Sequence, residues 1–250
     1  MHLYPLFDDI SSSLNFENLR ATFHHSPRPK KRGIIVKYYP VYIDITNERC
    51  VVVGGGDVAE RKVMRLIDSG AHVSVVSRTL TSTLEKMKKE GKIDHIEADY
   101  DDDSLSGAFL VIGATDRDDV NAKIFRDGRA KGCLVNIVDD PDNCNVILPS
   151  LFRRGDLSIA ISTGGKSPAL AKKLRQDMEH LFGPEYETLL MIMGKLREKI
   201  VMKGRSSNEN RQLFESVIHS DILHHIKEKK WKQVKKIIRD ITGEDIEVDE

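Results

Sequence analysis

Short apolar runs alternate with longer segments of helical spacing over residues 39–148. The helical spacing covers residues 57–69, 80–90 and 118–131. Strands that alternate with helices of this length need crossover connections, and these give a mainly parallel sheet covered on both faces. The pattern therefore predicts an α/β, doubly wound (Rossmann) domain, with strands expected at residues 41–45, 50–53, 73–76, 93–97, 109–112 and 134–138.

The rhythm changes after Pro149. One more strand-like run, residues 157–161, precedes a polar loop that opens a helix toward His180, and Gly183-Pro184 ends that helix. No strand pattern follows Glu185, so we expect a small α+β segment over residues 149–180 and a helical domain over 181–250. Because the run 157–161 follows a sheet that is already complete, we expect its strand partner to come from the other chain of a homodimer.

Composition excludes several classes of function. The 250 residues contain 39 basic and 39 acidic side chains, so no whole-chain field attracts nucleic acid or a membrane surface. The basic run at residues 24–33, within a polar extension over 1–38, is interpreted as a solvated linker, with a nucleic-acid arm as the alternative. No run approaches the ~18 apolar residues of a membrane span, and the first ten residues do not resemble a signal peptide.

Cysteine and histidine usage predicts neither a disulfide framework nor a metal site. The three cysteines, Cys50, Cys133 and Cys144, are an odd set without a CxxC motif, and the nine histidines form no HxxxH pair. We therefore expect no structural metal and a cytoplasmic, reducing setting.

A glycine-rich loop carries the first sign of function. The motif GxGxxA falls at Gly54, Gly56 and Ala59, after a buried strand and before a helix, with Gly55 between the two motif glycines. Gly54 permits a tight turn, Gly56 lets the backbone approach a pyrophosphate, and Ala59 lets the helix lie close to the sheet. The helix N-terminus then offers N–H groups to phosphates. The loop predicts a dinucleotide site.

The second strand ends in Ser77-Arg78-Thr79, where an acidic residue usually holds the adenosine ribose. Arg78 would suit a 2′-phosphate and hence NADP. The residues alone leave NAD and NADP open.

Thr115 and Asp116 follow a central strand, at the edge of the sheet where ligands bind in such folds. Asp116 could accept a proton beside the nicotinamide, or it could cap the helix that begins near Asp118. On position alone the two interpretations are equal.

A second loop has anion-binding chemistry. Gly164 and Gly165 free the backbone, Lys166 adds a positive charge, and Ser167 precedes Pro168 at a helix start. A carboxylate-rich substrate suits this loop, although an ordinary helix cap with a solvated basic face is at least as common.

Taken together, the motifs resemble the precorrin-2 dehydrogenase family, which includes the N-terminal module of multifunctional siroheme synthases. The resemblance covers about residues 39–238 and rests on the segments VVVGGGDVAERKV, GAHVSVV, GATDRDDVN, NIVDDP, ILPSLFRRGDLSIAISTGGKSPALAKKLR and RQLFESVIHSDIL. It implies NAD-dependent oxidation of precorrin-2 to sirohydrochlorin by a homodimer. Some members of the family also insert ferrous iron, which is then a substrate.

The resemblance also assigns roles to single residues. It implies that NAD contacts Asp57 and Val58 in the glycine loop and Arg78 and Thr79 after the second strand, which favours NAD over NADP. The aspartate of the family's ATD motif falls on Asp116, as the residue essential for dehydrogenation. Residues 149–180 would form the dimer contact and help to shape the substrate cleft. Asp140 stands where some members carry a regulatory serine, so phosphorylation cannot occur there.

An alternative is a regulatory NAD-binding module of a transport system, which also carries a glycine loop and an ATDxDxxN-like segment. Such modules resemble this chain only across residues 51–121, and they lack the stretch from PSLFRRGD to STGGKSPAL.

Overall fold

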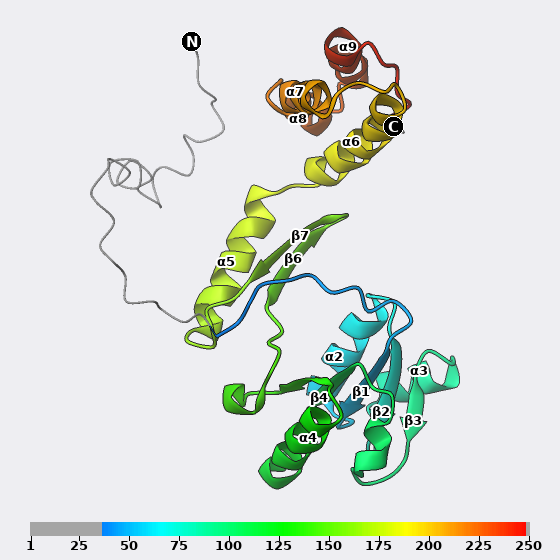
Figure 1. The fold of residues 1–250 in the computed structure, drawn as a ribbon, viewed down its shortest axis with the longest axis vertical. Helices are drawn as coiled ribbons and strands as arrows, with labels where there is room; N and C mark the ends of the chain where they lie inside the picture. Colours follow the sequence, from blue (N-terminus) through cyan, green and yellow to red (C-terminus); the bar gives the residue numbers. More distant parts are fainter. Residues whose placement is uncertain (1–36, 249–250) are drawn as a thin grey trace, which may run out of the picture. The chain divides into compact units, whose positions relative to one another are not determined.

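The computed structural model describes residues 37–248, so the basic run at 24–33 lies outside the described residues. The nucleotide domain is built on a five-stranded parallel sheet in the order β3-β2-β1-β4-β5 (Figure 1). The sheet confirms the predicted parallel architecture. Its strands are β1 (Arg49–Val53), β2 (His72–Val76), β3 (Asp94–Ile96), β4 (Leu110–Gly113) and β5 (Leu134–Ile137).

Three helices cover the two faces of this sheet: α2 (Asp57–Ile67), α3 (Ser82–Lys89) and α4 (Asp118–Ala130). The helices α2 and α3 pack their buried side chains against Val52, Val75 and Ile112. Ile124 of α4 packs with Val51 and Val111 on the other face. Alternate residues of the β-branched strands therefore fill two separate cores, which is why these strands are apolar throughout rather than alternating. The predicted doubly wound fold is confirmed.

The strand register brings the site residues to one edge. Val53 at the end of β1 pairs with Val76 of β2 and with Gly113 of β4. Because these strands end level with one another, the loops that begin at Gly54, Ser77 and Ala114 leave the sheet side by side, at the edge where α/β folds bind ligands.

The expected strand at residues 41–45 is wrong. The segment forms no strand, and Val41 and Tyr42 are 59% and 70% exposed. The Tyr42 hydroxyl donates a hydrogen bond to the Ser158 carbonyl at 2.9 Å. The segment has strand-like composition, but β1 already lies between β2 and β4, and none of the described strands pairs with it.

The sequence indicated no strand partner for the run 157–161 within its own chain, but one is present, and pairing with a second chain stays a prediction. The run 157–161 does form a strand, β7 (Leu157–Ile161), but it pairs antiparallel with β6 (Ser150–Arg154) of the same chain. Gly155, with φ of 54°, lies in the tight turn between them. The strand β6 was missed because two arginines follow Phe152, although the Phe152 side chain itself is buried.

Helix α5 (Pro168–Leu181) follows the hairpin, and the remainder of the described chain is helical, as predicted. The buried residues of these C-terminal helices include Leu196, Val217 and Ile238, which share one core. Within the described part of the chain, no helix combines the length and apolar character needed to cross a bilayer. The C-terminal helices are α6 (Glu185–Val201), α7 (Ser207–Ile218), α8 (Ile222–Lys227) and α9 (Trp231–Thr242).

Candidate active site

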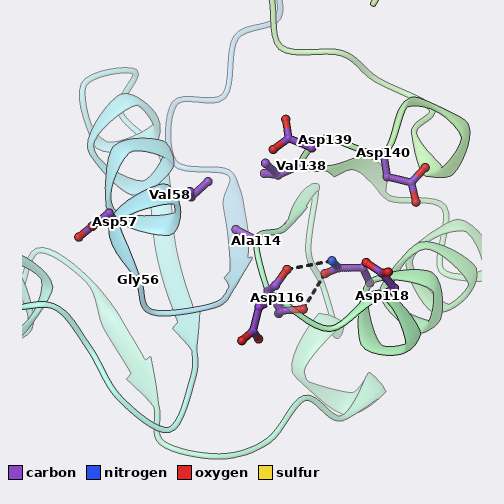
Figure 2. A pocket seen from close by; sticks show the side chains of 11 residues that line it. Gly56, Asp57, Val58, Ala114, Asp116, Asp118, Val138, Asp139 and Asp140 are labelled. Atoms are coloured by element: carbon purple, nitrogen blue, oxygen red, sulfur yellow. Dashed lines mark hydrogen bonds between the residues drawn. The ribbon is translucent and has the colours of Figure 1, made fainter.

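A cavity of about 480 Å³ opens at the carboxyl edge of the parallel sheet (Figure 2). The glycine loop and the start of α2 form one side of it, the loop after β4 and the start of α4 form another, and the loop after β5 completes it. Five of the predicted site residues share this space and could therefore act on one ligand: Gly56, Asp57, Val58, Thr115 and Asp116. The lining is Gly56, Asp57, Val58, Ala114, Thr115, Asp116, Asp118, Asn121, Val138, Asp139 and Asp140.

The three glycines of the loop are required for different reasons. Gly54 has φ of 126°, and a Cβ there would lie 2.3 Å from the Ala114 carbonyl oxygen. A Cβ on Gly55 would lie 1.9 Å from the Thr79 carbonyl oxygen. At Gly56, by contrast, a Cβ would meet no protein atom within 4 Å. Packing within the chain explains the first two glycines, whereas the open space at Gly56 fits the approach of a ligand.

The start of α2 is suited to a phosphate. Gly56 is the N-cap residue of α2, and no side chain caps this helix end. The N–H groups of the first turn have no partner within the helix, so they can donate to an anion, and the helix dipole adds to the attraction. Ala59 is fully buried, as expected of a residue that lets the helix lie close to the sheet. The residues present therefore fit the pyrophosphate of a dinucleotide.

The loop after β4 is held by Asn121 of α4. The Thr115 hydroxyl donates to the Asn121 side-chain oxygen at 2.8 Å, and the Asn121 amide donates to the Thr115 carbonyl at 3.0 Å. Asn121 is only 6% exposed. This reciprocal pair fixes the backbone immediately before Asp116, as the dashed lines in Figure 2 show. Asn121 was missed in the sequence because its role depends on a contact with Thr115.

Asp116 does not cap α4. The N-cap residue of that helix is Arg117, and no side chain accepts a hydrogen bond from its first turn. Asp116 is exposed and lines the cavity, and among the described residues its carboxylate accepts no hydrogen bond. The capping interpretation is therefore wrong, and the carboxylate is available to a ligand.

Further carboxylates line the cavity that the sequence analysis did not select. Asp118 begins α4, and Asp139 and Asp140 follow β5, so the edge of the sheet brings them to Asp116. Asp140 accepts hydrogen bonds from the side chain and backbone of Asn143, and these hold the pKa of Asp140 below its usual range. The position of Asp139 and Asp140 after a parallel strand was a signal that could have identified them.

Arg78 and Thr79 do not line this cavity, and neither do Gly54 and Gly55. They lie beside the glycine loop instead: the Thr79 carbonyl faces Gly55, and the Thr81 N–H donates to the Gly55 carbonyl at 3.0 Å. The Arg78 side chain is paired with Asp99, whose proximity the sequence did not indicate.

The loop of Gly164, Gly165, Lys166 and Ser167 also lies outside the cavity lining. The Ser167 hydroxyl oxygen accepts a hydrogen bond from the Leu170 N–H, so Ser167 is an ordinary N-cap of α5. Gly165 lies near Pro141, since a Cβ there would be 3.7 Å from the Pro141 side chain. Pro141 follows Asp140, which does line the cavity.

The three consecutive carboxylates of Asp101, Asp102 and Asp103 lie within 4.8 Å of one another and are exposed. Asp101 accepts a hydrogen bond from the Asp103 N–H, and Asp102 forms an ion pair with Lys131 at 3.2 Å. These local contacts account for two of the three carboxylates.

A parallel sheet with an uncapped helix after its glycine loop defines a dinucleotide-binding protein of the Rossmann class. Comparison with known families agrees. A family model of NAD(P)-binding domains matches residues 41–150, and a model of the central part of sirohaem biosynthesis proteins matches residues 154–181. The second match lies outside the segment shared with regulatory NAD-binding modules, so that alternative is not favoured.

Known proteins extend the similarity. Siroheme synthase 1 of Aeromonas salmonicida is 38% identical over 186 residues, which are 74% of this chain and 40% of that protein. The siroheme synthase of Methylobacillus flagellatus is 38% identical over 183 residues, 73% of this chain and 39% of that protein. The chain thus spans about 40% of the length of these relatives. The solved structure of SirC, precorrin-2 dehydrogenase, superposes with a TM-score of 0.67 and 25% identity, covering 80% of this chain and all of that one.

The order of the two matched segments, the relatives and the solved structure agree with one another. Over these segments the chain is similar to SirC, precorrin-2 dehydrogenase, and to the corresponding part of siroheme synthases.

Proposed function

We propose that this chain catalyses the NAD-dependent oxidation of precorrin-2 to sirohydrochlorin. The observation that carries the proposal is the cavity lined by both Gly56, which leaves open space, and Asp116, whose carboxylate accepts no hydrogen bond from the described residues. The names of the relatives and of the superposable structure support the choice of substrate.

The dinucleotide would be held by the glycine loop and its neighbours. The N–H groups at the start of α2, among them those of Asp57 and Val58, would receive the pyrophosphate, while Gly54 and Gly55 set the course of the loop. Arg78 and Thr79 would lie on the adenosine side, and Thr115 on the nicotinamide side. When bound, NAD supplies the acceptor for the hydride that leaves precorrin-2.

Asp116 would take the accompanying proton. A general base must be titratable and must reach the reacting group, and Asp116 lines the cavity without a competing hydrogen bond among the described residues. Thr115 and Asn121 hold the loop that carries Asp116, so its position is set before the substrate binds. The loop from Gly164 to Ser167, with Lys166, would contact carboxylates of the tetrapyrrole.

The organisation of the protein completes the proposal. We assign residues 1–38 to an extension, 39–148 to the NAD-binding domain, 149–180 to a dimerisation and substrate-cleft segment, and 181–250 to a helical domain. Exposed apolar side chains on α5, including Leu170 at 49% and Leu174 at 37%, support a homodimer contact in this segment. The three cysteines, all within the described residues, are buried thiols, which supports a reducing, cytoplasmic setting.

The dehydrogenase activity is tested by mixing the protein anaerobically with precorrin-2 and NAD and following the absorbance of sirohydrochlorin. We expect sirohydrochlorin and NADH to appear together in equal amounts. Formation of neither product by a folded protein that binds NAD would contradict the proposed reaction.

A second candidate activity is the insertion of ferrous iron, as a substrate, into sirohydrochlorin. The observation that favours it is the group of carboxylates around one cavity, Asp116, Asp118, Asp139 and Asp140, since iron insertion requires acceptors for the pyrrole protons. The test is the consumption of sirohydrochlorin with ferrous iron and without NAD. A rate equal to that of the protein-free reaction would restrict the chain to dehydrogenation.

A further inference from the structure

The Arg78 side chain at the end of β2 is already bound by a carboxylate. Arg78 Nε donates to Asp99 Oδ1 at 2.7 Å, and its terminal nitrogen donates to Asp99 Oδ2, so the pair is bidentate. Both side chains are exposed, at 75% and 66%, and a ligand can therefore reach them. A bidentate carboxylate occupies the same donors of the guanidinium that a phosphate would use.

This pair lies beside the nucleotide loop. Arg78 is flanked by Ser77, whose carbonyl lies 2.9 Å from His95 Nε2, and by Thr79, whose carbonyl faces Gly55. The His95 Nδ1 lies 3.0 Å from the Lys88 ammonium, which donates to it and leaves Nε2 as the N–H that bonds to Ser77. The strand end that carries Arg78 is thus fixed against the glycine loop. In dinucleotide-binding folds this position contacts the adenosine ribose.

We infer that Asp99 gives this protein its preference for NAD over NADP, by holding Arg78 in a carboxylate pair that a 2′-phosphate would have to displace. Asp99 follows β3 rather than β2, so it supplies the negative charge of the ribose site from the neighbouring strand. The inference rests on the proposed function, because it requires a dinucleotide on the glycine loop.

The surrounding charges agree with this role. The next cation along the same edge, Arg117, is itself paired with Asp119 at 2.6 Å. The guanidinium of Arg78, with a smaller contribution from Arg117, holds the pKa of Asp99 below its usual range, so the carboxylate stays ionised at neutral pH. A 2′-phosphate would enter a site in which Arg78 and Arg117 are already ion-paired with carboxylates, and Asp99 would repel it.

The test measures the dissociation constants of NAD and NADP by calorimetry in the full chain at low ionic strength. The central variant is Asp99→Asn, which keeps the size of the side chain and removes its charge. We expect NADP to bind at least about fourfold more tightly than to the wild type, since both side chains are largely exposed and repulsion between charges ~5 Å apart in bulk water is of that order. NAD affinity should change by less than about twofold, because NAD has no 2′-phosphate.

Three further variants separate this role from a general effect of charge. Asp102→Asn removes the same charge three residues away, from an ion pair with Lys131, and should leave the NAD to NADP ratio unchanged. Asp99→Glu preserves the carboxylate and should preserve the preference for NAD. Arg78→Gln combined with Asp99→Asn should bind NADP less tightly than Asp99→Asn alone, because it lacks the guanidinium that Asp99→Asn releases.

An unchanged NADP affinity in Asp99→Asn, with normal NAD binding, would overturn the inference while leaving the proposed function intact. Equal affinity of the wild type for the two nucleotides would overturn it as well. Failure of the wild type to bind either nucleotide would instead refute the dinucleotide site, and the inference with it.

Discussion

Substitution of Gly56 separates ligand binding from folding more cleanly than substitution of either neighbouring glycine. Gly56 has φ of −89° and ψ of −174°, which any residue can adopt, and a Cβ there would meet no protein atom within 4 Å. Replacing Gly by Ala at an N-cap costs a few tenths to about 1 kcal/mol. The smaller entropy of the unfolded chain returns about 0.4 to 1 kcal/mol. We therefore expect the free energy of unfolding of Gly56→Ala to stay within about 1 kcal/mol of the wild type.

The effect on NAD should be large by comparison. The side chain of Gly56→Asp would place a carboxylate in the space that the pyrophosphate needs. One unit charge about 5 Å from another, at an effective dielectric constant of about 20, is repelled by ~3 kcal/mol, which is about a hundredfold in affinity. We expect Gly56→Ala to weaken NAD binding by about tenfold and Gly56→Asp by about a hundredfold or more.

The assay combines urea denaturation with calorimetric titration of NAD. Gly54→Ala and Gly55→Ala serve as controls, because a Cβ at these positions would lie 2.3 Å and 1.9 Å from carbonyl oxygens. Both should lose about 1 to 3 kcal/mol of stability, as expected for a strained or overpacked backbone. A folded Gly56→Asp protein with the NAD affinity of the wild type would refute the reasoning and move the dinucleotide away from this loop.

Three further predictions concern other parts of the chain. Asn121→Ala should lower the free energy of unfolding by about 1 to 3 kcal/mol in urea denaturation, because it removes both hydrogen bonds to Thr115; an unchanged midpoint would contradict the role of Asn121. Burial raises the pKa of the Cys50 thiol from 9.0 to about 11, so stability should fall as the pH rises through this interval, and native Cys50 should resist alkylation at neutral pH; rapid alkylation there would contradict the burial. Light scattering at micromolar concentration should give a dimer, and a stable monomer would exclude the proposed homodimer.

The sequence predicted the parallel sheet well because its strands are marked by local composition. Runs such as Cys50–Val53 and Val73–Val76 are rich in β-branched residues and almost free of polar ones, because both faces of the sheet are buried. The segment 41–45 is also rich in β-branched residues, yet it forms no strand. Local composition shows that a segment can form a strand, but it does not show whether a neighbouring strand has a free edge to pair with it.

In the candidate site, too, the sequence indicated the features that are local in the chain and missed those that depend on contacts between distant residues. The glycine loop and Asp116 were identified because each follows a buried strand at the ligand-binding edge. The pairing of Arg78 with Asp99 was not, because the two residues are 21 positions apart and meet only through the adjacency of β2 and β3. The sequence also left the cap of α4 open, since Asp116 and Arg117 are adjacent and the sequence does not show which of them is the N-cap residue.

The most direct measurement of the central claim is the single-turnover rate of precorrin-2 oxidation by Asp116→Asn at saturating NAD. Asp116 is exposed and accepts no hydrogen bond among the described residues, so the substitution should change the free energy of unfolding by less than about 0.5 kcal/mol and leave NAD affinity unchanged. Loss of the titratable carboxylate should slow oxidation by about 10² to 10⁴ fold. A folded Asp116→Asn protein that oxidises precorrin-2 at the wild-type rate would contradict the account, because proton transfer would then not involve this carboxylate.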